Sequence, residues 1–158
     1  MDREALKEAM KTSISEVLET MFFLPLEVSE TETDGPLFRI PPEKLTSARL
    51  QFQGRFQGEA MFLVPYTLAT SLTADFMGQE PGKIGPDDVQ GTLKELLNMI
   101  CGKALSLFDP KESFNLGIPE MIDSGKALGG FCSKEENDIT LVFNAIENQL
   151  AVRMAFHR

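Results

Sequence analysis

Hydrophobic residues near the start of the chain recur at spacings of three and four. They are Leu6, Met10, Ile14, Val17, Leu18 and Met21. Because residues three and four apart share one face of a helix, this spacing predicts a helix over residues 2–24, ended by Pro25. Residues 26–44 contain Gly-Pro and Pro-Pro pairs, which indicate a loop with short extended pieces at most.

The hydrophobic period changes to two over residues 45–65, as is typical of strands. With Gly54 and Gly58 in its middle, this stretch predicts a hairpin of two strands. Residues 66–77 return to a helical pattern. Gly78 follows at the position where glycine commonly caps the end of a helix.

The longest predicted helix covers residues 87–108. Asp87 and Asp88 place negative charge at the positive end of its dipole, and Pro110 lies just past its other end. The strands predicted after it are Phe114 to Ile118 (short), Gly129 to Cys132, Ile139 to Asn144 and Leu150 to Phe156, with turns at Asn137-Asp138 and Glu147-Asn148.

The order of these elements is helix, strands, two helices, strands. This order predicts an α+β domain in which long helices pack on an antiparallel sheet. The chain has 158 residues and no stretch that resembles a linker, so we expect one domain over residues 1–158.

The helix over residues 87–108 has two distinct faces when it is turned by ~100° per residue. The face expected in the core carries Val89, Leu93, Leu96, Leu97, Ile100, Ala104, Leu107 and Phe108. The opposite face, here called the polar stripe, carries Gly91, Glu95, Asn98, Gly102 and Ser106.

Two glycines flank the Glu95–Asn98 pair within the polar stripe. Glycine inside a helix costs roughly 0.5–1 kcal/mol relative to alanine, so stability alone does not favour this choice. Gly91 and Gly102 would leave a bare strip that another backbone or side chain could approach. Helix geometry also allows the simpler interpretation that Glu95 and Asn98 are solvated surface residues.

The composition narrows the choice of partners. The net charge is -9, with 24 acidic residues against 15 basic ones. A chain this acidic is repelled by phosphate backbones and by anionic lipid. We therefore expect a protein or small-molecule partner and neither nucleic acid nor membrane.

Cysteine usage and hydropathy indicate the compartment. Cys101 and Cys132 have no CxxC spacing, which favours two reduced thiols in a cytosolic protein. The first residues lack the apolar core of a signal peptide, and no apolar run approaches the ~20 residues that span a bilayer. We therefore expect a cytoplasmic protein.

Residues 94–104 read KELLNMICGKA. This segment resembles the ExxNM-x-x-GKA signature of the CheX/CheC family of chemotaxis phosphatases. The likeness continues at residues 58–61, 77–78, 117–119 and 124–125 and in the closing hairpin, so it covers nearly the whole chain. It implies a pseudo-duplicated fold with two long helices in equivalent positions on one face of the sheet.

The resemblance also implies an activity, which is hydrolysis of the phosphoaspartate of a CheY-type response regulator in two-component signalling. Glu95 and Asn98 would be catalytic: the Asn98 carboxamide would position the attacking water, and Glu95 would pair with the partner's lysine. The phosphatase would need no metal or cofactor of its own, since the phosphorylated receiver domain holds Mg²⁺. The residues expected to contact this partner are Gly91, Lys94, Met99 and Gly102.

The first helix departs from the two-site pattern of CheC-type members. It offers Glu16-Val17-Leu18-Glu19, with a carboxylate where the amide should stand. The chain therefore resembles the one-site CheX type. Leu97 replaces a glycine common in the family and should face the core. The resemblance and the strand at residues 150–156, which could form an open sheet edge, favour a homodimer.

Two other functions remain open. The same fold could serve as a non-catalytic binding module for a response regulator or a flagellar switch component, because fold does not determine function. An unrelated hydrolase with Cys101 or Ser106 as nucleophile would need a base, and His157 is the only histidine. The methionines are most simply packing residues.

Overall fold

The computed structural model describes residues 2–29, 35–133 and 138–157. Its helices are α1 (Arg3–Phe22), α2 (Tyr66–Met77), α3 (Pro86–Phe108) and α4 (Ser124–Cys132), with short 3₁₀ turns η1 (Pro36–Arg39), η2 (Pro42–Lys44) and η3 (Pro81–Lys83). Its strands are β1 (Glu27–Val28), β2 (Leu45–Gln53), β3 (Gln57–Pro65), β4 (Asn115–Leu116), β5 (Glu120–Ile122), β6 (Ile139–Asn144) and β7 (Gln149–His157).

The described strands form one antiparallel sheet of seven strands. The order across the sheet is β1-β6-β7-β3-β2-β4, and β5 also pairs with β2. The predicted hairpin over residues 45–65 is confirmed as β2 and β3, and β6 and β7 form the second hairpin. The β6–β7 turn is closed where the Ala145 N–H donates to the Asn148 carbonyl at 2.8 Å. The predicted turn residue Asn137 lies outside the described residues.

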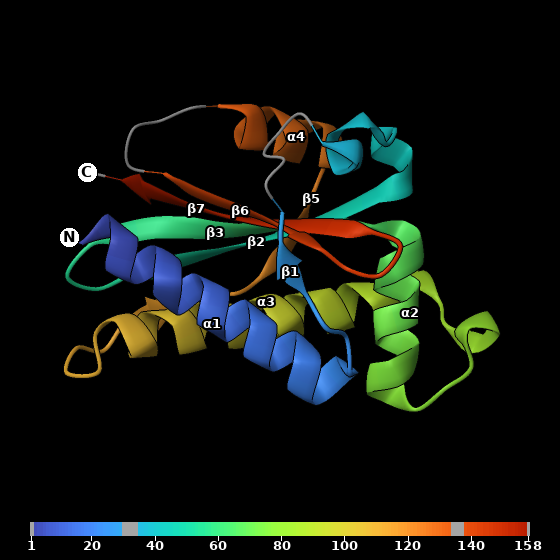
Figure 1. The fold of residues 1–158 in the computed structure, drawn as a ribbon, viewed down its shortest axis with the longest axis horizontal. Coiled ribbons are helices and arrows are strands. Elements are labelled where there is room, and N and C mark those ends of the chain that lie inside the picture. Colours follow the sequence, from blue (N-terminus) through green and yellow to red (C-terminus); the bar gives the residue numbers. More distant parts are fainter. Residues whose placement is uncertain (1, 30–34, 134–137, 158) are drawn as a thin grey trace.

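The three longer helices cover one face of the sheet, and α4 with η1 and η2 covers the other (Figure 1). The larger apolar cluster lies under α1, α2 and α3, and a smaller one, centred on Phe131, lies under α4. The α+β class with long helices on one face is therefore confirmed.

The helix ends follow from local chemistry. The Asp2 carboxylate caps α1 by accepting from the Ala5 N–H at 3.1 Å. At the start of α3 the Asp88 carboxylate accepts from the Gly85 N–H at 2.9 Å. Gly78 caps α2 in the left-handed conformation, with φ 65°, as predicted. The first helix ends at Phe22, two residues earlier than predicted.

The predicted strand Gly129 to Cys132 is wrong, since these residues form the second half of α4. Asp123 caps this helix by accepting from the Lys126 N–H at 3.0 Å, and Ala127 and Phe131, four apart, are both buried. Glycines hide the helical period in the sequence. A Cβ at Gly130 would lie 2.8 Å from the Met61 Cε, so a larger residue there would require the end of the Met61 side chain to move.

The predicted open edge at residues 150–156 is also wrong. Strand β7 lies between β3 and β6: its residues 151–157 pair with β3, and its residues 149–154 pair with β6. Periodicity cannot tell an edge strand from an inner one when both are apolar. Within the described residues, the edges of the sheet are formed by β1 on one side and by β4 and β5 on the other.

Candidate active site on helix α3

Helix α3 packs against both α1 and the sheet (Figure 1). The Ser13 hydroxyl of α1 donates to the Ile100 carbonyl at 2.8 Å in a buried position. Leu93, Leu96 and Leu97 are fully buried beneath the helix. The prediction that Leu97 faces the core is therefore confirmed. An anchored helix of this kind can hold its outer side chains in a defined direction.

The predicted core face is wrong at one residue. Leu107 is 47% exposed, whereas Leu105 is buried. Leu105 and Leu116 of β4 line the same hollow at the end of α3. Thr92 and Cys101 are buried as well. The covered face thus shifts around α3 along its length, which a fixed angle per residue does not anticipate.

The polar stripe lies on the outer side of α3. Glu95 and Gly91 are exposed, and Asn98 and Gly102 are half-buried. Asn98 lies about one turn from Glu95, so the two polar groups are adjacent. Among the residues that the structure describes, neither side chain takes part in a hydrogen bond or an ion pair. Both groups can therefore meet an approaching molecule.

The space around the two glycines also leaves the stripe open to an approaching molecule. A Cβ at Gly91 would meet nothing within 4 Å, and one at Gly102 would lie 3.4 Å from the Leu116 Cδ1. Packing within the chain therefore does not require glycine at position 91. Lys94 and Met99, predicted to contact a partner, are half-buried beside the stripe.

Two hollows lie at different distances from the stripe. One of about 320 Å³ adjoins it and is lined by Gly102, Leu105, Ser106, Pro110, Glu112, Ser113, Phe114 and Leu116. A larger one of about 740 Å³ lies between η1, η2 and the start of α2 and contains no residue of the stripe. Its lining includes Arg39, Glu43, Lys44 and Tyr66 as well as three prolines, but none of the residues that carry the family signature. We therefore place the candidate site on α3.

The equivalent surface of α1 carries different chemistry. Glu16 and Glu19 are both exposed, and Glu16 forms an ion pair with Lys103 of α3. The outer surface of α1 thus presents two carboxylates and no amide. The lysine of the GKA segment is engaged in holding α1 and α3 together.

The thiol chemistry of Cys101 argues against a cysteine hydrolase. Its side chain is fully buried, and burial raises the pKa of the thiol to about 12. The thiolate, which is the nucleophilic form, is therefore scarce at neutral pH. Cys132 is exposed at the end of α4, on the opposite face of the sheet from α3. The described residues contain no cluster of three His, Cys, Asp or Glu side chains that could hold a metal.

A family model described as chemotaxis phosphatase CheX matches residues 46–144, which include the whole polar stripe. The chain belongs to the CheX family. The resemblance in residues 94–104 is therefore confirmed at the level of the family. A search among curated proteins finds no match. No helix within the described residues is long and apolar enough to cross a membrane.

Solved structures of CheX-like proteins share the fold. The CheX-CheY-BeF3-Mg+2 complex from Borrelia burgdorferi matches with a TM-score of 0.72 and 16% identity, covering 96% of this chain and 97% of that chain. CheX from Vibrio vulnificus gives 0.72 and 17%, covering 99% of both chains. A CheC-like superfamily protein from Shewanella sp. PV-4 gives 0.72 and 18%, covering 98% of both. At these identities the likeness establishes the fold alone.

Proposed function

We propose that this CheX-family chain is a phosphatase that hydrolyses the phosphoaspartate of a CheY-type response regulator in chemotaxis signalling. The observation that carries the proposal is the Glu95–Asn98 pair. It lies on the outer face of an anchored helix, is bracketed by Gly91 and Gly102, and falls within the residues matched by the family model. A CheX is bound to CheY in a solved complex, which supports a receiver domain as the partner.

The reaction requires an aligned water more than covalent help from the protein. Water attacks the phosphorus, the bond between phosphorus and the aspartyl oxygen breaks, and inorganic phosphate and a free carboxylate result. Such transfers are catalysed chiefly by positioning and by stabilisation of charge. The Asn98 carboxamide suits the task because it can both accept and donate a hydrogen bond. We assign it the role of holding the water in line.

Glu95 takes a different role in this mechanism. As a carboxylate at the solvent surface it can pair with the lysine of the receiver domain and orient the docking. The partner's Mg²⁺ and lysine then stabilise charge on the phosphoryl oxygens, and the phosphatase supplies no metal or cofactor. A cytoplasmic location follows from the partner, because response regulators act in the cytoplasm.

A rate measured against partner concentration tests the roles. Asn98→Ala should lower the rate at saturating receiver domain by on the order of 100-fold, as the loss of one positioned group typically does, with little change in binding. Asn98→Asp should also be poor, because a carboxylate cannot donate a hydrogen bond. Glu95→Ala should chiefly weaken docking and raise KM. Full activity of Asn98→Ala at saturation would overturn the mechanism and favour a non-catalytic binding module.

We also propose that the protein is a homodimer, as the family resemblance implies. The sheet edges that could pair with a second copy are β1 and the β4–β5 side. Sedimentation at micromolar concentration should give about twice the monomer mass of 17.5 kDa. A monomer mass there would reject this part of the proposal.

A further inference from the structure

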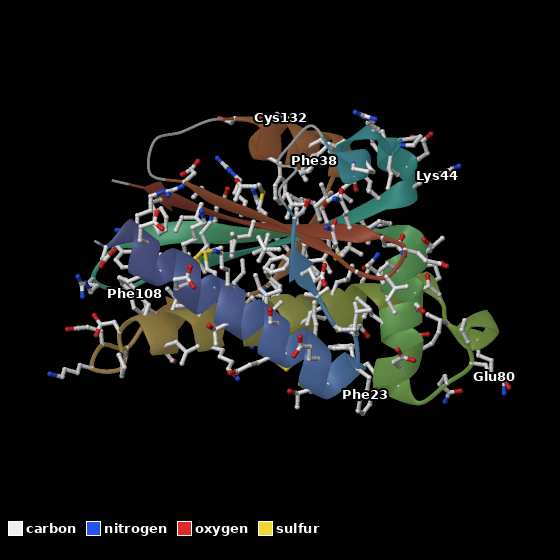
Figure 2. The ribbon with its side chains drawn as sticks, viewed as in Figure 1. Phe23, Phe38, Lys44, Glu80, Phe108 and Cys132 are labelled. Atoms are coloured by element: carbon white, nitrogen blue, oxygen red, sulfur yellow. The ribbon has the colours of Figure 1, made fainter. Side chains whose placement is uncertain are left out.

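Helices α1 and α2 end side by side in an exposed apolar group, here called the apolar corner. It consists of Met21, Phe23, Phe76 and Met77, which are 42%, 84%, 42% and 43% exposed. The two helix ends are joined by the rings of Phe22 and Phe76, whose centroids are 5.8 Å apart. Figure 2 shows Phe23 at the end of α1, on the side of the molecule away from the sheet.

The backbone conformation of Phe23 lowers the stability of the isolated chain. It has φ 53°, and among the described residues it is the only non-glycine with positive φ. A left-handed conformation is costly for a residue with a bulky side chain. Helix α2 ends at the same corner with Gly78 in the same conformation, the residue that geometry favours. The chain thus has a strained, almost fully exposed phenylalanine at a position suited to glycine.

The apolar corner lies close to the polar stripe. Ser13 of α1 contacts Ile100 of α3, and the two helices run in opposite directions (Figure 1). From Ser13 to Phe23, α1 advances about 15 Å at 1.5 Å per residue. The same distance backwards along α3 from Ile100 reaches the region of Gly91. Measured along the helix axes, the corner is therefore level with the start of the stripe at Gly91.

We propose that the apolar corner, with Phe23 at its centre, is a docking surface for the receiver domain whose phosphoaspartate reaches Asn98. This inference rests on the proposed phosphatase function. A stable interface buries roughly 800 Å² per partner, a patch about 16 Å in radius. Centred on Glu95 and Asn98, such a patch extends far enough along α3 to reach the level of the corner. Exposed aromatic side chains such as Phe23 are of the kind that is enriched in protein interfaces.

The charges around the corner favour a receiver domain over a second copy of this chain. Glu19 on α1 and Asp75 on α2 are exposed beside the apolar side chains. Two copies facing each other here would bring like charges together, which is unfavourable. The partner surface that fits is an apolar patch bordered by lysine or arginine.

Binding and stability should change in opposite directions in Phe23→Gly. The probe is a receiver domain loaded with beryllium fluoride and Mg²⁺, chosen from a panel of the organism's own receiver domains. The affinity of Phe23→Gly for it should fall at least tenfold, as for loss of an aromatic anchor. The Tm of Phe23→Gly should not fall and should rise by up to roughly 3 °C, because glycine relieves the strain. Phe23→Tyr should retain affinity. Ile146→Gly, at an 82% exposed residue in the β6–β7 turn, serves as the control and should bind like wild type.

The outcomes separate this inference from the proposed function. If wild type hydrolyses the phosphoaspartate but Phe23→Gly keeps wild-type affinity and KM, the docking surface is refuted and the phosphatase stands. If Phe23→Gly loses affinity while wild type shows no turnover, the docking surface stands and the phosphatase fails. If Phe23→Gly only dissociates a dimer without losing affinity for the receiver domain, the corner is a self-association surface and the assignment is wrong.

Discussion

Gly91→Ala should make the protein more stable and less active. An added Cβ would meet nothing within 4 Å, so the substitution has no steric cost in the isolated chain. Alanine in a helix interior is favoured over glycine by about 0.5–1 kcal/mol. For a chain of this length that corresponds to a rise in Tm of roughly 1–4 °C. Gly102 is a less suitable test, because a Cβ there would crowd Leu116.

The methyl group would nevertheless stand on the polar stripe, one turn before Glu95. If a receiver domain approaches this bare strip, Gly91→Ala should raise KM for the phosphorylated partner several-fold. Thermal unfolding without partner and dephosphorylation rates against partner concentration measure the two effects separately. Gln90→Ala, exposed on the same turn, is the matched control and should leave KM near wild type. A stabilised Gly91→Ala variant with unchanged KM would refute the idea that the glycine is kept for docking.

Two further predictions concern α1 and the buried thiol. Glu16→Ala should keep phosphatase activity near wild type. It should lower the free energy of unfolding by at most about 1 kcal/mol, because the ion pair of Glu16 with Lys103 is solvent-exposed. A loss of activity as deep as that of a Glu95 variant would reveal a second site. Burial raises the pKa of Cys101 to about 12 in the folded protein, against an ordinary value of about 9. Between these two pH values the unfolded chain loses the thiol proton while the folded chain keeps it, so the free energy of unfolding should fall as pH rises from 9 towards 12. Chemical denaturation measures the free energy of unfolding at each pH in this range. If Cys101→Ala loses stability with pH as steeply as wild type does, the loss does not come from Cys101.

The position of the candidate site could be predicted from the sequence because the signals that define α3 are local to it. The helix is long, its apolar residues recur with helical spacing, and Asp87, Asp88 and Pro110 mark its ends. Once the period is fixed, Glu95 and Asn98 fall together on the outer face. Local rules therefore predict where Glu95 and Asn98 lie, whereas their proposed catalytic roles come from the resemblance to the family.

Other features depend on tertiary contacts that local rules do not contain. Helix α4 was predicted as a strand because Gly129 and Gly130 hide its period, and the contact between position 130 and Met61 of the sheet is visible in the structure alone. Leu105 is buried in the main apolar cluster although its position on the helix predicts an exposed side. Likewise, the spacing around Phe23 predicts a helix up to residue 24 and contains no sign of a left-handed aromatic residue facing solvent.

The pairing of β3 with β7 has a consequence for how the site forms during folding. Gln57 pairs with His157 and Leu63 with Ala151, and α3 lies between these partners in the chain. Contacts between residues so distant in sequence make folding slow, because a long loop must close before the pairing is gained. During synthesis α3 can form early as a helix, but the sheet beneath it stays incomplete until β7 has left the ribosome. The anchored surface that presents Asn98 should therefore be among the last features to mature.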